Sequence, residues 1–275
     1  MKVLLTGNRG RLGPSIGRRL LEDGHEVSGF DLESGDDILD AGAVMRAANG
    51  VNAIVHVAGV AGDRGRPASE VLAVNLSGTA NVLIAAETQG VERVIYLSSG
   101  RALGMLERDA DYLPLDDDHR GLPSVPYALG KWLCEEMCQA FTARTGVKTI
   151  CLRPVQVFND SDYEKALAQP TVPFRPGSVW SLGVHIHVLD VAEAVAAAVH
   201  CDAPPHTRML LCAPDIASDR PTLELVAERV PHIPWRGGDD FRADPFQSLV
   251  DIRKAERILG WKPIHTWPGR PAADR

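Results

Sequence analysis

Short runs of β-branched and aliphatic residues alternate with longer stretches of helical apolar spacing through the first two thirds of the chain. The short runs, bounded by glycine and polar residues, predict strands at Lys2–Thr6, Glu26–Phe30, Ala53–Val57, Arg93–Ser98 and Thr149–Arg153. The stretches between them predict helices at Gly13–Asp23, Ala41–Asn49, Gly78–Gln89 and Tyr127–Thr145. Because strands that alternate with helices form right-handed βαβ units, we expect an α/β fold with a Rossmann-type doubly wound parallel sheet.

The pattern changes after Arg153. Residues 156–182 are expected to be irregular, because prolines and polar residues interrupt them. Residues 186–200 predict a strand that runs into an alanine-rich helix, and Thr207–Ala213 predicts another strand. We therefore expect a nucleotide-binding domain formed by residues 1–155 and about 183–213. A small, discontinuous C-terminal substrate lobe would comprise residues 156–182 and 214–275, with a helical and loop-rich end.

The composition is that of an ordinary globular chain of 275 residues, with 45% hydrophobic and 24% charged residues. A net charge of -7 gives no electrostatic reason to expect nucleic acid or an anionic membrane as a partner. The sequence shows neither a signal-peptide pattern nor a long unbroken apolar run, and its five cysteines form no disulfide framework. We expect a cytoplasmic protein.

No metal site is expected. His185 and His187 would share one face of a strand, but no third ligand lies at a suitable spacing. Asp116, Asp117 and Asp118 are expected to form a solvated loop in front of the last predicted helix of the first domain.

The first strand runs into a glycine-rich turn, TGNRGRLG at residues 6–13. Gly7 suits a tight turn, Gly10 lets the backbone approach a pyrophosphate, and Gly13 allows close packing of helix on strand. The amide groups at the start of the following helix favour bound phosphates. Position between a strand and a helix makes this spacing a dinucleotide-binding hypothesis.

The second predicted strand ends at Asp31, whose carboxylate can accept hydrogen bonds from the adenosine ribose. A 2'-phosphate would meet like charge there, so Asp31 favours NAD over NADP. Arg9 is the alternative, because a guanidinium in this loop can pair with a 2'-phosphate. Solvated loop charges are the simpler interpretation of Arg9 and Arg11.

Further motifs follow in a fixed order. They are DDILD at 36–40, VHVAG at 55–59, NLSGTANVL from Asn75, YLSSGRALG at 96–104, YALGK at 127–131, LRP at 152–154, IHVLDVAEAV at 186–195 and DIRKAERILGWKP at 251–263. Together with the glycine-rich turn they resemble the motifs of the extended short-chain dehydrogenase/reductase family, its NAD-dependent epimerase/dehydratase group. The resemblance spans nearly the whole chain.

The resemblance implies roles for individual residues. The cofactor-binding set would be Gly7, Arg9, Gly10, Arg11, Leu12, Gly13, Asp31, Asp37, Ile38, Val57, Ala58, Gly59, Asn75, Leu97, Tyr127, Lys131 and Pro154. The catalytic set would be Ser99, Tyr127 and Lys131, with Ser99 orienting the substrate oxygen and Lys131 also holding the nicotinamide ribose. Ser98 is expected to serve the strand itself.

Spacing supports a joint role for Tyr127 and Lys131, since one helical turn places both on the same face. A neighbouring ammonium stabilises a phenolate, which suits a tyrosine to general acid/base chemistry. In the implied reaction Tyr127 removes a hydroxyl proton while hydride passes to NAD. A packed ring beside a solvated ammonium is the ordinary alternative for such a pair.

The first hypothesis is an NAD-dependent sugar epimerase or dehydratase that acts on a nucleotide-activated sugar. Arg236, in WRGGD at 235–239, resembles an arginine of the family that binds the substrate diphosphate, and Gln156 follows the LRP strand. The alternative is a dehydrogenase of a free sugar, a uronate or a related alcohol, in which Arg101 would pair with a substrate carboxylate. A non-catalytic dinucleotide sensor is the third possibility.

The family often dimerises through the helices that begin near Gly78 and Tyr127, which implies a homodimer here. Ser99, Arg101, Gln156 and Arg236 complete the expected site as candidate substrate residues.

Overall fold

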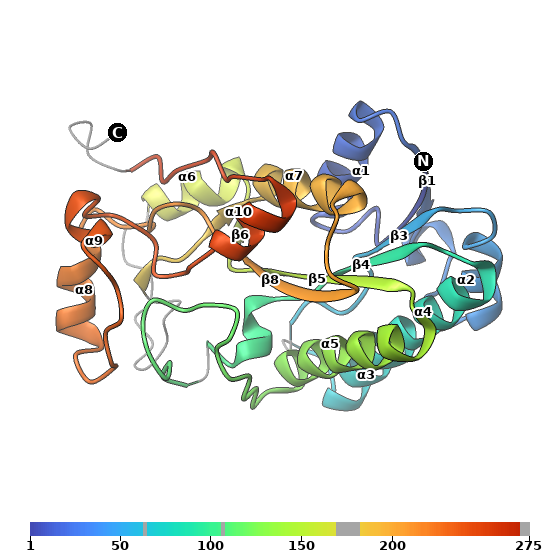
Figure 1. Ribbon diagram of the computed structural model, residues 1–275, viewed down its shortest axis with the longest axis horizontal. Helices are drawn as coiled ribbons and strands as arrows, with labels where there is room; N and C mark the ends of the chain where they lie inside the picture. Colours follow the sequence, from blue (N-terminus) through green and yellow to red (C-terminus); the bar gives the residue numbers. More distant parts are fainter. Residues whose placement is uncertain (63–64, 106–107, 169–181, 270–275) are drawn as a thin grey trace.

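The computed structural model describes residues 1–62, 65–105, 108–168 and 182–269 (Figure 1). Its centre is a parallel sheet in the order β2-β1-β3-β4-β5-β8. The strands are β1 (Lys2–Thr6), β2 (Glu26–Phe30), β3 (Ala53–His56), β4 (Arg93–Leu97), β5 (Lys148–Pro154) and β8 (His206–Leu211). The predicted Rossmann-type doubly wound sheet is confirmed, and its predicted strands are found within one or two residues.

The order of the strands creates a crevice at one edge of the sheet. From β1 the chain moves outward to β2, then returns to the other side of β1 as β3 and continues in that direction. Thr6 pairs with both Phe30 and His56, so the segments that follow these three strands leave the sheet side by side. Such a switch point, at the carboxyl ends of the strands, is where open α/β sheets bind ligands.

Helices cover both faces of the sheet, as Figure 1 shows. One face carries α1 (Gly13–Glu22) and α7 (Val188–His200), which pack against each other. The other carries α2 (Ala41–Ala47), α4 (Gly78–Gln89) and α5 (Pro126–Thr145). Side chains alternate along a strand, so Val3 and Leu5 join the core under α1 and α7, whereas Leu4 joins the core under α4 and α5.

One long helix runs from Ala68 to Gln89, through α3 (Ala68–Leu72), a π-helical turn η2 (Ala73–Ser77) and α4. Within the described residues it is the helix long and apolar enough, by length and composition alone, to cross a membrane. Core helices pass the same test, and this helix packs against α2 and α5 and buries Val82 and Leu83 in the core.

The C-terminal third is more structured than the sequence pattern suggests. Residues 156–182 were expected to be irregular, but β6 (Val157–Phe158) and α6 (Asp160–Ala168) form in the first part of this segment, and β6 pairs with β7 (Ile186–His187). For residues 169–181 the expectation lies outside the described residues. Asp160 and Asp162 in the first turn of α6 complement the helix dipole, which favours a helix here. The remaining helices are α8 (Thr222–Arg229), α9 (Asp240–Ala243) and α10 (Arg253–Leu259), with 3-10 turns η1 (Leu32–Ser34) and η3 (Gly100–Leu103). The division into two domains stays a prediction.

Candidate active site

A cavity of about 600 Å³ opens at the carboxyl ends of β1, β3 and β4. Most of the predicted cofactor residues line it: Gly7, Gly10, Arg11, Leu12, Asp31, Asp37, Ile38, Val57, Ala58, Gly59, Leu97, Tyr127 and Lys131. The structure therefore brings together segments that lie far apart in the sequence. This is the crevice expected from the order of the strands.

The glycine-rich turn packs tightly under the cavity. Gly7 has φ of 72°, and a Cβ atom there would lie 2.6 Å from the backbone nitrogen of Ala58. Gly13 sits behind the turn, where a Cβ atom would lie 2.2 Å from the carbonyl oxygen of Gly7. Leu12, the N-cap of α1, makes no side-chain capping hydrogen bond to the first turn of the helix. The backbone amide groups of that turn can therefore donate hydrogen bonds to an anionic ligand.

Asp31 is held in place by two backbone amides. Its Oδ2 accepts a hydrogen bond from Arg9 N at 2.9 Å, and its Oδ1 accepts one from Glu33 N at 3.0 Å. The guanidinium of Arg9 instead donates to Ser34 Oγ at 2.8 Å. A carboxylate thus stands at the end of β2, where an adenosine ribose is expected.

Tyr127 and Lys131 face the same cavity from α5. Lys131 is buried, its Nζ donates to the carbonyl oxygen of Leu97 at 2.7 Å, and it lies 6.0 Å from the centre of the Tyr127 ring. The guanidinium carbon of Arg101 lies 5.1 Å from the centre of the same ring. Two cations therefore flank the ring of Tyr127. Ser99 is almost fully buried, and its Oγ accepts a hydrogen bond from Arg101 N at 3.2 Å.

A buried polar chain supports the floor of the cavity. Thr6 Oγ1 accepts hydrogen bonds from the amides of Val57 and Ala58 and contacts His56 Nδ1 at 2.8 Å. His56 Nε2 lies 3.1 Å from Thr79 Oγ1. Burial, with the nearby charge of Lys131 as the smaller cause, lowers the pKa of His56 to about 3. His56 is accordingly a neutral structural link between β1, β3 and the long helix.

Some predicted residues lie elsewhere. Within the described part of the chain, Arg9, Gly13, Asn75, Ser99, Arg101, Pro154, Gln156 and Arg236 are not among the lining residues of this cavity. Asn75 acts on the backbone behind it: its Oδ1 accepts from Val60 N at 2.8 Å, and its Nδ2 donates to Val60 O at 3.3 Å. Pro154 is buried at the end of β5 and Gln156 is exposed.

Arg236 belongs to a second cavity, of about 540 Å³. Its guanidinium stacks on the ring of Tyr112 at 3.7 Å. The charged residues that line this cavity are Asp116, Asp240, Asp244, Asp251, Glu256, Arg236 and Arg253. Acidic side chains outnumber basic ones in this lining, which counts against a diphosphate ligand at Arg236.

Two features were missed in the sequence. Ser98 does not simply serve its strand, since it lines the cavity and donates from Oγ to the buried carboxylate of Glu135 at 2.5 Å. Glu135 follows Lys131 by one helical turn, and that spacing was the available signal. Asp117 was expected to be solvated, but its Oδ1 accepts from Leu210 N at 2.7 Å and its Oδ2 is buried without a hydrogen-bond partner among the described residues.

The comparison with known proteins identifies the family. A model of the NAD dependent epimerase/dehydratase family matches residues 3–212, most of the chain. The chain belongs to this family. The match contains the whole cavity described above, from the glycine-rich turn to Lys131.

Individual members of the family differ in what they do. The chain is 31% identical over 164 residues to the uronate dehydrogenase of Pseudomonas syringae pv. tomato, covering 55% of this chain and 58% of that one. The chain thus spans little more than half of this relative's length. It is 24% identical over 306 aligned positions to the UDP-glucose 4-epimerase of Corynebacterium glutamicum, covering 97% and 92%. A short-chain dehydrogenase/reductase superfamily protein from Agrobacterium tumefaciens with bound NAD has a similar structure, with a TM-score of 0.73, 21% identity and coverage of 97% and 94%.

Membership confirms the predicted family, the NAD-dependent epimerase/dehydratase group. The predictions of an NAD-dependent enzyme and of NAD as its cofactor agree with this family. The residues around the cavity have the properties that binding of NAD requires. Gly7 and Gly13 sit where the backbone leaves no room for a Cβ atom, the first turn of α1 offers amide donors, and Asp31 offers a carboxylate.

The buried carboxylate of Asp117 makes the stability of this family member depend on pH. Burial raises the pKa of Asp117 to about 6, against the opposing charges of Lys254 and Arg153. Asp117 therefore contributes stability that is present below its unfolded pKa of about 3.9 and is lost as the pH rises through about 6. Two pKa units correspond to about 3 kcal/mol.

Asp117→Asn is expected to gain about 2 kcal/mol in unfolding free energy relative to wild type when the pH is raised from 4.5 to 8, because about a third of the full loss in the wild type has already occurred at pH 4.5. Urea denaturation of both proteins at the two pH values measures this change. Asp118→Asn is the matched control, because Asp118 is exposed in the same loop. An equal stability difference at both pH values would contradict the prediction.

Proposed function

We propose that the chain is an NAD-dependent dehydrogenase that oxidises a hydroxyl group of a small acidic sugar, a uronate or a close relative. The observation that carries this proposal is the guanidinium of Arg101, 5.1 Å from the centre of the Tyr127 ring. A substrate whose hydroxyl group reaches Tyr127 brings a nearby carboxylate within range of a charge-assisted hydrogen bond to Arg101. The partial match to a uronate dehydrogenase supports the same substrate class.

In the proposed reaction each residue has a defined task. The glycine-rich turn, Asp31 and Lys131 hold the cofactor. Bound NAD supplies the hydride acceptor for the carbon that carries the hydroxyl group. Ser99 donates a hydrogen bond to the substrate oxygen, and the Oη atom of Tyr127 takes the hydroxyl proton. Lys131 and Arg101 place positive charge beside the ring that takes this proton.

The second candidate is an epimerase or dehydratase of a nucleotide-activated sugar. It is favoured by the match to a UDP-glucose 4-epimerase over nearly the full length of both chains. The predicted diphosphate ligand, Arg236, counts against it, because that arginine lies in the second, mainly acidic cavity. We therefore place this candidate second.

Arg101→Met and Arg236→Met separate the two candidates. If a uronate is the substrate, Arg101→Met is expected to raise its KM about 10- to 100-fold, the value of a lost hydrogen bond between charged groups, and Arg236→Met is expected to change little. Formation of NADH from glucuronate and galacturonate, and conversion of UDP-glucose, measure both activities. Conversion of UDP-glucose that depends on Arg236 and not on Arg101 would favour the second candidate.

We also propose that the chain works as a cytoplasmic homodimer. The proposal rests on the resemblance to a family that often dimerises through the helices beginning near Gly78 and Tyr127, which here are α4 and α5, packed against each other. A uronate or sugar nucleotide would be its small-molecule partner.

A further inference from the structure

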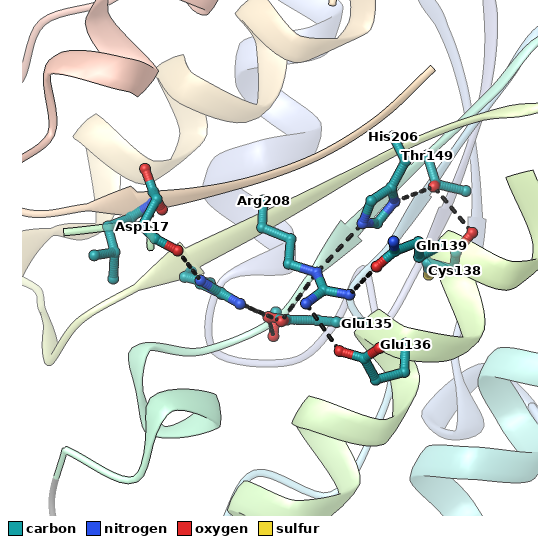
Figure 2. Close-up of polar contacts among 11 residues, drawn as sticks. Asp117, Glu135, Glu136, Cys138, Gln139, Thr149, His206 and Arg208 are labelled. Atoms are coloured by element: carbon teal, nitrogen blue, oxygen red, sulfur yellow. Dashed lines mark hydrogen bonds and ion pairs between the residues drawn. The ribbon is translucent and has the colours of Figure 1, made fainter. Parts of the chain in front are cut away.

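The carboxylate of Glu135 is completely buried behind the cavity and is held by four hydrogen bonds and ion pairs. Its Oε1 accepts from Ser98 Oγ at 2.5 Å and from Arg153 Nε at 2.9 Å, and its Oε2 accepts from Arg153 Nη2 at 2.6 Å. Arg208 Nε lies 3.7 Å from Oε2, on the side where Figure 2 shows Glu136 and Gln139 beside the same guanidinium. Glu135 is thus the centre of a charged network between α5, β4, β5 and β8.

Stability alone does not explain this network. The free energy of removing a carboxylate and a guanidinium from water offsets much of the free energy of their attraction. Apolar residues of similar size often give a fold of equal stability. What an ion pair adds is a fixed geometry, because Arg153 grips the carboxylate with two nitrogens. The remaining hydrogen bond to Oε1 comes from Ser98, the member of the network that lines the cavity.

The position of Glu135 on α5 links it to the transfer site. Tyr127, Lys131 and Glu135 are spaced by four residues and therefore lie along one face of the helix. Lys131 binds the carbonyl oxygen of Leu97, and Glu135 binds the hydroxyl group of Ser98. The helix thus holds two consecutive residues at the end of β4, and Ser99 comes next.

We propose that Glu135 is a positioning residue for the reaction, which acts through the hydroxyl group of Ser98 to fix the segment that carries Ser99 and Arg101. This inference rests on the proposed function, in which Ser99 and Arg101 contact the substrate. Glu135 itself touches neither substrate nor cofactor. Arg153 and Arg208 hold the carboxylate, and Ser98 transmits its position to the strand end.

Ser98→Ala tests the link without disturbing the ion pair. A misplaced strand end is expected to lower kcat about 100-fold, while the Kd for NADH, measured by its fluorescence, stays within about threefold of wild type. The double variant Glu135→Leu with Arg153→Met removes both buried charges together and keeps an apolar packing. It is expected to show the same fall in kcat, and adding Ser98→Ala to it is expected to cause no further fall.

Glu136→Gln is the matched control, because Glu136 binds the same Arg208 at 2.9 Å from the neighbouring position on α5. It is expected to keep the wild-type kcat. Amide hydrogen exchange of the NAD-loaded protein gives a second readout, in which residues 97–104 exchange faster in the Ser98 and Glu135 variants but not in Glu136→Gln. Wild-type kcat and exchange in Ser98→Ala would overturn the proposal.

The two proposals fail in different ways. If neither uronates nor UDP-glucose are converted by the wild-type protein, the proposed function fails, and hydrogen exchange at residues 97–104 still decides whether Glu135 fixes the strand end. If the wild-type protein is active and the double variant retains its kcat, the role of Glu135 is refuted while the proposed function stands.

Discussion

Replacing Tyr127 with Phe is expected to lower turnover by about 10²- to 10⁴-fold, the usual contribution of a general base, while NAD binding is kept. The ring would still pack against Arg101 and Lys131, but the oxygen that takes the substrate proton would be gone. Steady-state formation of NADH from a uronate measures kcat, and NADH fluorescence measures cofactor affinity. The effect is expected in kcat rather than in affinity.

Tyr96→Phe is the control for this experiment. The ring of Tyr96 lies 4.7 Å from Lys131 Nζ, so this control removes another phenol oxygen near the same ammonium. Tyr96 is buried and is not one of the described residues that line the cavity. Tyr127→Phe with unchanged turnover would refute the proposed role. Turnover absent in both the wild type and the variant, with NAD still bound, would instead favour a dinucleotide sensor.

Gly13→Ala is expected to weaken NAD binding by at least about 100-fold, because a displaced turn loses two or more hydrogen bonds to phosphate at about 1.5 to 3 kcal/mol each. The added Cβ atom would lie 2.2 Å from Gly7 O and 2.5 Å from the Cα and carbonyl carbon of Asn8. All three are backbone atoms, so the turn can relieve the contact only by moving as a whole. Isothermal titration with NAD measures the loss.

Gly17→Ala provides the control on the same helix. There the new Cβ atom would meet the end of the flexible Leu5 side chain at 3.3 Å, and alanine is the better helix former. NAD affinity is expected to be that of the wild type. Tight NAD binding by Gly13→Ala would show that the turn is less constrained than its packing indicates.

The features that could be predicted from the sequence depend on residues close together in the chain. The glycine-rich turn, the alternation of strands with helices, and the four-residue spacing of Tyr127 and Lys131 are local patterns, and the structure places them as expected. The family motifs also predict the positions of Asp31 and Leu97, because these residues stand at the ends of β2 and β4. The order of the strands then brings those strand ends to the same edge of the sheet.

The features that were missed depend on distant segments. Arg11 was interpreted as a solvated charge and is exposed, but no pattern in the sequence indicated its partners, Val157 O at 2.7 Å and Asp162 Oδ2 at 2.5 Å. Asp117 is half-buried, and its carboxylate accepts a hydrogen bond from Leu210 N in β8. No spacing rule relates residues so far apart, and their environments follow only once the sheet has assembled.

The two amide hydrogen bonds of Asp31 limit how this protein can be redesigned. The side chain that we expect to bind the ribose also shapes the turn, since it accepts from Arg9 N and Glu33 N at the start of η1. An engineer who replaces this one residue to couple the enzyme to an NADPH supply would also remove the acceptor that shapes the loop. The same carboxylate is expected to determine the choice of cofactor and also shapes the loop, so a change of cofactor should require replacing residues 31–34 together.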